Sequence, residues 1–205
     1  MQLKEVRDPV HGFIYFNETE MKIVISLANI QGSSDMPNTL RATSIVALIA
    51  NARTRPLGKT QLQKLVYFLQ RAGVPLNYTF EIYHYGPYSF ELSQEMSSLD
   101  SLGVLSIESE PGGYGFDIRL GKFAERFTLD DKYRRKFDKV LDQFGTSTAA
   151  QLEVMATIHF VNAVMKKRSQ NTTPAVIKQV KALKPRFNDH FIKGCYSDLQ
   201  RSGWV

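Results

Sequence analysis

The sequence has few cysteines and no long apolar run, and each lack excludes a class of protein. Cys195 is the sole cysteine among 205 residues, so no disulfide forms within the chain, and its place in an amphipathic pattern predicts a core residue. The apolar-rich stretches at 45–50 and 154–164 are too short to span a bilayer, and no signal-peptide pattern opens the chain. We therefore expect a cytoplasmic protein that does not bind a membrane.

Catalytic motifs are also absent from the sequence. There is no phosphate-binding glycine loop and no GxSxG elbow, and turn geometry explains the glycines within 112–115. Asp189-His190, and Glu153 with His159, lack the spacing of CxxC, HExxH or EF-hand metal sites. We expect no metal, no cofactor, no catalytic residue and no enzymatic activity.

Basic residues outnumber acidic ones. The chain has 26 Lys and Arg against 20 Asp and Glu, a net charge of +6, while 43% apolar and 22% charged residues are ordinary for a folded protein. This balance favours a polyanionic partner, although a solvated surface explains it equally well. The cations form three clusters: Lys132, Arg134, Arg135, Lys136 and Lys139; Lys166, Lys167 and Arg168; and Lys178, Lys181, Lys184 and Arg186.

The patterning predicts an α+β, mostly helical protein in three parts. Residues 1–38 form an N-terminal extended or hairpin segment plus a short helix near 18–27, and a polar, glycine-containing stretch ends this part. Residues 39–127 form a winged-helix-like core with a two-stranded wing. Residues 128–205 form a C-terminal helical subdomain.

The core is predicted from its alternation of helical and strand patterns. A helix at 39–53 is followed by a second helix in which the Thr60 hydroxyl caps an apolar face containing Leu62, Leu65, Val66 and Leu69. We then expect a strand at 79–83, a turn at Gly86-Pro87, a helix at 89–102 capped by Ser89, and strands at 104–107 and 114–120 around a 111–113 turn. Helix, helix and hairpin is the winged-helix order.

The rest of the chain reads as helices at 129–144, 148–167, 174–183 and 188–202. The stretches 98–104 and 197–205 both end a helix with Leu, Gly and Val. They indicate either a weak internal repeat or a shared helix C-cap chemistry.

Two aromatic motifs resemble a known family. LVYFLQ at 65–70 and YHYGPYS at 83–89, followed by Leu92, Leu99, Leu102 and Gly103, resemble the YwgA-like proteins and, more distantly, the Panacea family. The resemblance covers residues from about 39 to the C-terminus. The Panacea family implies a largely helical, winged-helix-related fold used as an antitoxin or proteolysis adaptor, whereas the YwgA-like group implies no defined activity.

A second resemblance is confined to the beginning of the chain. DPVHGFI at 8–14 resembles the opening of HD-superfamily nucleotide triphosphohydrolases. Those enzymes hold a metal through an adjacent His-Asp pair, and no histidine in this sequence is followed directly by an aspartate. The segment therefore supports at most a degenerate nucleotide phosphohydrolase, the weakest functional alternative.

Protein binding and DNA binding remain as the main hypotheses. We favour a non-catalytic, regulatory or antitoxin-like module whose partner is a toxin or client protein, anchored by Tyr83, Tyr85 and Tyr88. Core packing of at least two of these tyrosines is the alternative reading. A DNA-binding transcriptional regulator is the alternative function, with phosphate contacts from Lys59, Lys64, Arg71, Lys132, Arg134, Arg135, Lys136 and Lys139.

Overall fold

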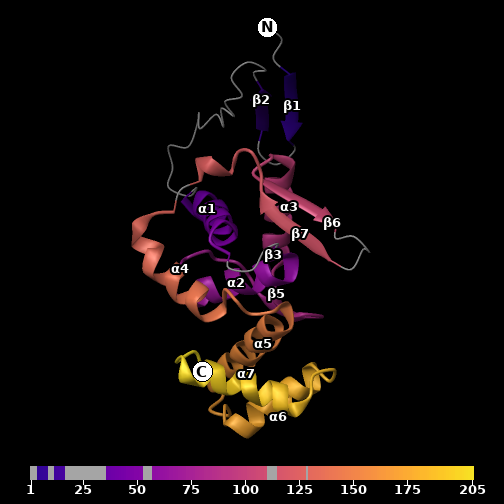
Figure 1. Cartoon of the computed structure of the whole chain (residues 1–205), viewed down its shortest axis with the longest axis vertical. Coiled ribbons are helices and arrows are strands. Elements are labelled where there is room, and N and C mark those ends of the chain that lie inside the picture. The colour runs from indigo at the N-terminus through magenta and orange to yellow at the C-terminus, as the bar shows by residue number, and fades with distance from the viewer. Residues whose placement is uncertain (1–3, 9–11, 17–35, 53–56, 110–114, 128) are drawn as a thin grey trace. The chain divides into compact units, whose positions relative to one another are not determined.

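The computed structural model describes residues 4–8, 12–16, 36–52, 57–109, 115–127 and 129–205 (Figure 1). The chain divides into two compact units, residues 1–36 and 37–205. The second unit contains both residues 39–127 and residues 128–205, which the sequence patterning predicts as separate parts.

The first unit contains an antiparallel hairpin. Its strands are β1 (Lys4–Asp8) and β2 (Gly12–Phe16), with Lys4 opposite Phe16 and Asp8 opposite Gly12. The prediction of extended segments around a turn agrees with this hairpin. The turn itself, the helix expected at 18–27 and the loop up to residue 35 lie outside the described residues, while Pro37 and Asn38, predicted as the end of that loop, belong to the helix that begins at Met36.

From the unit boundary onward, the described chain is mostly helical, which confirms the α+β class. The elements are α1 (Met36–Ala50), β3 (Leu57–Gly58), α2 (Lys59–Arg71), β4 (Glu81–Tyr83), β5 (Gly86–Tyr88), α3 (Phe90–Ser101), β6 (Leu105–Ser109), β7 (Phe116–Leu120), the 3-10 helix η1 (Ala124–Arg126), α4 (Asp131–Phe144), α5 (Ala149–Lys166), α6 (Thr173–Leu183) and α7 (Asp189–Arg201).

Helix α2 is the centre of the core. Every residue from Leu62 to Leu69 is buried, because α2 packs against α4, α5 and the strands β3, β5 and β7. The Phe68 ring stacks on Phe144 of α4 at 3.8 Å between centroids, and Trp204 packs edge-on against both rings. The burial of such large rings contributes strongly to the stability of this unit.

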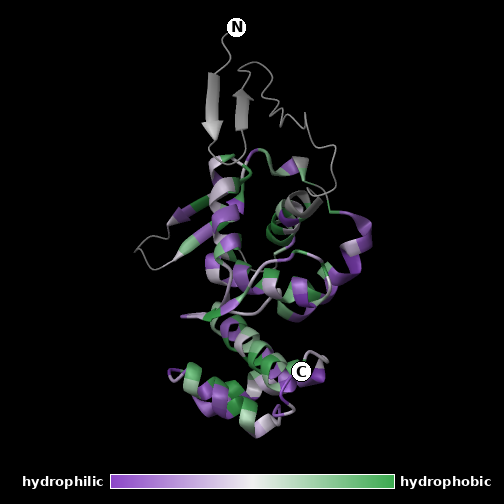
Figure 2. Cartoon of the chain, turned by 180° about the vertical axis from the view of Figure 1, so that it is seen from behind, coloured by the Kyte–Doolittle hydropathy of each residue, from purple (hydrophilic) through white to green (hydrophobic). Residues whose placement is uncertain are grey.

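Helix α5 joins this core to the C-terminal helices. It contacts α2 and β5 as well as α6 and α7. Hydrophobic residues alternate with hydrophilic ones along α5, α6 and α7 in Figure 2, the pattern of helices that bury one face against each other. Cys195 of α7 is buried at this junction, as predicted, and burial raises the pKa of its thiol to about 11.

A three-stranded antiparallel sheet covers part of the core. Its order is β3-β7-β6, so Ile118 of β7 lies opposite both Leu57 and Ile107. Leu57 and Ile118 are buried, and α3 packs against β6. The predicted hairpin at 104–120 therefore exists, and β3 adds a third strand that the sequence analysis did not predict. The predicted turn of this hairpin, at 111–113, lies outside the described residues.

Local capping explains where several helices begin. The side chains of Ser89, Thr148 and Asn188 accept hydrogen bonds from the backbone N–H groups of Leu92, Gln151 and Phe191, respectively. The Ser89 cap confirms the prediction. The predicted Thr60 cap is wrong: α2 begins at Lys59 after Gly58, whose N–H donates to the Gln61 side chain.

Helices α2, α3 and α7 end in the same way. Gly73, Gly103 and Gly203 each have a positive φ, and the N–H of the following residue donates back to the helix. This is the glycine C-cap that satisfies otherwise unpaired carbonyls. The similar endings at 98–104 and 197–205 thus share a cap geometry. None of the helices in the described part of the chain has the length and hydropathy needed to cross a membrane.

Candidate protein-interaction surface

The β4–β5 hairpin turns at His84 and Tyr85 rather than at the predicted Gly86-Pro87. Tyr83 pairs with Gly86 and Ile82 with Pro87, so Gly86 and Pro87 belong to the returning strand. The predicted turn is therefore wrong. Gly86 has φ +83°, a backbone conformation that glycine adopts without strain, and this conformation permits the reversal directly after Tyr85.

This turn leaves aromatic side chains in solvent. Tyr83 is 48% exposed, Tyr85 53% and Phe90, the first residue of α3, 57%, while Tyr88 is half-buried. The alternative reading, core packing of at least two of the three tyrosines, is wrong, because Tyr85 lies in the two-residue turn, Tyr83 directly precedes it, and both rings are about half exposed. Sequence reasoning missed Phe90, although its position directly after the Ser89 cap was a usable signal.

Three of these rings, Tyr83, Tyr88 and Phe90, contact one another. Tyr83 lies 5.6 Å from Phe90 and 5.7 Å from Tyr88 between ring centroids, and Tyr88 lies 5.0 Å from Phe90. The Arg186 guanidinium lies 5.2 Å from the centroid of the Tyr85 ring. We call Tyr83, Tyr85, Tyr88 and Phe90 the aromatic surface. Mutual packing of this kind restricts ring motion without removing the rings from solvent.

Two buried lysines hold the backbone beneath the aromatic surface. Lys64 of α2 donates from Nζ to the Pro87 carbonyl at 2.6 Å, and Lys184, at the end of α6, donates to the His84 carbonyl at 2.6 Å. Gln63 makes a pair of hydrogen bonds with the Ser89 backbone, at 2.9 and 3.0 Å. The hairpin is thus fixed from α2 on one side and from the α6 end on the other.

Glu153 of α5 neutralises part of this buried charge. Its Oε1 lies 3.0 Å from Lys184 Nζ as an ion pair without hydrogen-bond alignment, and its Oε2 accepts from Arg186. Glu153 and Lys184 are both buried. Burial is the main cause that lowers the pKa of Lys64 to about 7, with Glu153 opposing the shift and Lys184 adding to it.

The predicted nucleic-acid residues do not form one surface of free cations. Lys64 is 1% exposed, so its inclusion was wrong: its ammonium binds the hairpin and cannot reach a phosphate. The others have these positions: Lys59 and Arg71 lie over the Phe116 and Tyr67 rings, Lys132 and Arg134 pair with Asp130 and Asp131, Lys136 donates to the Gly73 carbonyl, Lys139 lies over Trp204, and Arg135 is exposed.

The residues considered for metal binding are engaged elsewhere. Glu153 pairs with two cations, and His159 Nδ1 lies 2.8 Å from the Tyr67 hydroxyl within an aromatic cluster. Asp189 lies 3.8 Å from Lys181. Across the described residues, His, Cys, Asp and Glu form no group of three or more suited to a metal ion.

His159 makes the stability of the fold depend on pH. Burial, and secondarily the charge of Arg71, lower its pKa from 6.5 to about 4, so the folded state binds fewer protons than the unfolded chain between these values. The free energy of unfolding should fall as the pH drops from 6.5 to about 4, by up to about 1.4 kcal/mol per pH unit. Urea titrations across this range should show a smaller slope for His159→Gln, whereas the exposed-site control His190→Gln keeps the wild-type slope.

Comparison with known proteins places the chain among distant relatives. No family model matches it. It is 29% identical over 140 residues to a DNA ADP-ribosyl glycohydrolase of Thermus aquaticus, which covers 64% of this chain and 37% of that protein. It is 26% identical over 115 residues to the uncharacterized protein YwgA of Bacillus subtilis, which covers 53% of this chain and 67% of YwgA. The chain thus spans little more than a third of the Thermus aquaticus protein, and the YwgA match supports the predicted YwgA-like resemblance.

Proposed function

We propose that this chain is a non-catalytic interaction module that binds a protein partner through the aromatic surface. The observation that carries this proposal is the exposure of Tyr83, Tyr85 and Phe90 on a backbone held by the buried side chains of Lys64 and Lys184. Tyrosine and tryptophan are enriched at the energetic centres of protein interfaces. A rigid backbone lowers the entropy that these anchors lose on binding.

The arrangement around the aromatic surface supports a winged-helix-like scaffold. Two helices, α2 and α3, precede the β6–β7 hairpin, and the short strand β3 between α1 and α2 pairs with β7. In a DNA-binding winged helix, the helix before the wing approaches the groove. Here that helix is α3, which carries the acidic residues Glu91, Glu95 and Asp100. These acids oppose phosphate and favour a protein partner, with Arg41 compensating part of the charge of Glu91 and Glu95.

Two of these acids have structural roles. Asp100 Oδ1 accepts from the Ile107 N–H, which attaches α3 to the wing. Glu95 Oε2 accepts from the Tyr78 hydroxyl at 2.7 Å, and burial raises the pKa of Glu95. Helix α3 is therefore a packed scaffold element, and its exposed acid Glu91 lies 3.8 Å from the Arg41 guanidinium.

The name of the Thermus aquaticus relative raises glycosidic hydrolysis as an activity for comparison. Carboxylic acids that cleave glycosidic bonds must reach the bond that breaks. Glu153 is buried against Lys184 and Arg186, and Glu95 is bonded to Tyr78, so neither is presented to a substrate. The Panacea resemblance makes a toxin or a client protein the class of partner that we propose.

The test compares capture by matched variants of the tagged chain after nuclease treatment. Tyr83→Ala/Tyr85→Ala should lose its protein partner, because each anchor lost at an interface centre costs about 2 kcal/mol, or about thirtyfold in affinity. Its free energy of unfolding should change by less than about 1 kcal/mol, since both rings are exposed. Phe116→Ala, which removes another exposed aromatic ring from β7, is the control and should retain the partner.

Three results would contradict the proposal. The first is capture of the same proteins by wild type and by the tyrosine double variant. The second is recovery of DNA fragments that nuclease removes, with no protein partner. The third is release of ADP-ribose from modified DNA by the purified chain.

A further inference from the structure

The net positive charge of the chain comes from one segment, because cations and acids nearly balance in the rest. Residues 154–188 contain seven of the 26 Lys and Arg and none of the 20 Asp and Glu, which leaves 19 cations and 20 acids in all other residues together. This segment covers most of α5, all of α6 and the connection to α7. Glu153 and Asp189, which flank the segment, pair with Lys184, Arg186 and Lys181, so the local excess rests on the other four cations.

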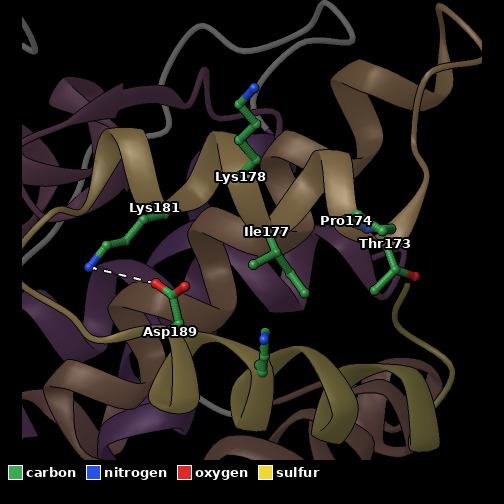
Figure 3. Close-up of a pocket in the computed structure, with 7 residues that line it drawn as sticks. Thr173, Pro174, Ile177, Lys178, Lys181 and Asp189 are labelled. Carbon is green, nitrogen blue, oxygen red and sulfur yellow. Dashed lines mark ion pairs between the residues drawn. The ribbon is translucent and has the colours of Figure 1, made fainter.

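A groove of about 450 Å³ lies where this segment meets α7. Its lining includes the apolar residues Pro174 and Ile177, three lysines and one acid. Figure 3 shows Ile177 directed from α6 toward α7, Lys181 directed toward Asp189, and Lys178 directed away from α7 at the outer edge. The groove therefore combines an apolar floor with a charged rim. The charged lining residues are Lys178, Lys181, Lys193 and Asp189.

The fold uses one of the three lysines and leaves two available. Lys181 Nζ donates to the Phe187 carbonyl at 2.7 Å and to the Pro185 carbonyl at 3.2 Å, and it lies 3.8 Å from Asp189. Lys178 and Lys193 are exposed, and neither has an ion-pair partner among the residues that the structure describes. With Asp189 offset by Lys181, the rim carries two unpaired positive charges.

We propose that this groove binds an acidic segment of a partner protein that carries an apolar side chain between its carboxylates. The carboxylates pair with Lys178 and Lys193, and the apolar side chain packs on Pro174 and Ile177. A nucleic acid fits less well, because its phosphates offer nothing to the apolar floor and the lining has no aromatic ring on which a base stacks. The groove and the aromatic surface share no residue, so this proposal does not depend on that surface.

The test measures binding of a short fluorescent peptide that alternates glutamate with leucine. Lys178→Gln/Lys193→Gln should weaken its binding by about 3- to 30-fold, the effect of two lost surface ion pairs. Arg135→Gln/Lys139→Gln on α4 removes the same charge elsewhere and should leave the affinity unchanged. A second peptide with serine in place of leucine should bind the wild-type chain more weakly, because it leaves the apolar floor uncovered.

Several outcomes would overturn the proposal. Equal weakening by both double variants means that general charge attracts the peptide. Equal binding of the two peptides means that the apolar floor has no role. Absence of peptide binding to the wild-type chain, or tighter groove-dependent binding of an oligonucleotide of matched charge with a steep salt dependence, likewise rejects an acidic protein segment as the occupant.

Discussion

Replacing Glu153 with glutamine is expected to lower the free energy of unfolding by about 3–5 kcal/mol. The carboxylate lies 3.0 Å from Lys184 Nζ, and both side chains are buried. Glutamine keeps the shape but removes the charge, so Lys184 stays buried without compensation. The same change lowers the pKa of Lys64 further, because Glu153 is the group that raises it. Chemical denaturation monitored by circular dichroism measures the effect.

Two comparisons separate the buried charge from other causes. Asp138→Asn neutralises an exposed acid on α4 and should change stability by less than about 0.5 kcal/mol. The double variant Glu153→Leu/Lys184→Met removes both charges and should recover much of the loss, since a buried ion pair and an apolar pair are often similar in stability. If Glu153→Gln is as stable as the wild type, the buried ion pair is not what supports the hairpin.

Replacing Gly86 with alanine is expected to destabilise the protein by about 2–5 kcal/mol. One cause is the backbone, because φ at Gly86 is +83° and alanine is strained there. The other is space: a Cβ at Gly86 would lie 2.6 Å from Thr157 Oγ1 and 3.1 Å from the Glu153 carbonyl oxygen. The substitution therefore separates β5 from α5, and thermal denaturation should show the loss.

Substitutions at two other glycines separate the cost of backbone strain from the cost of the close contact with α5. A Cβ at Gly203 meets nothing within 4 Å but φ is +71°, so Gly203→Ala tests backbone strain alone and should cost about 1–2 kcal/mol. A Cβ at Gly194, inside α7, also meets nothing within 4 Å, and Gly194→Ala should stabilise by about 0.5–1 kcal/mol. If Gly86→Ala costs no more than Gly203→Ala, the close contact with α5 is not restrictive. Adding Thr157→Ala to Gly86→Ala should recover part of the loss.

The variants Glu153→Gln and Gly86→Ala also test the proposed function. Both change the support beneath the aromatic surface and leave its rings in place, so each should weaken partner binding together with stability. The tyrosine double variant should weaken binding alone. This contrast distinguishes a residue that holds the surface from one that contacts the partner.

The sequence by itself determined the features that depend on neighbouring residues. The helices after residue 128 begin and end within a few residues of their predicted limits, because polar N-caps, glycine C-caps and apolar spacing act within one or two turns. The cap at Ser89 and the burial of Cys195 follow from the same local patterns.

Only the tertiary structure decided which of these side chains are exposed to solvent and which are buried. Aromatic residues such as Tyr83 and Tyr85 are typical of a buried strand. The hairpin nevertheless turns at His84-Tyr85, because Gln63 and Lys64 of α2 hold the segment from Gly86 to Ser89. Lys64 reads as a surface cation, yet it is buried because it meets the Pro87 carbonyl, while the Glu153 charge lies nearby. These contacts join residues that are distant in the sequence, and no local pattern encodes them.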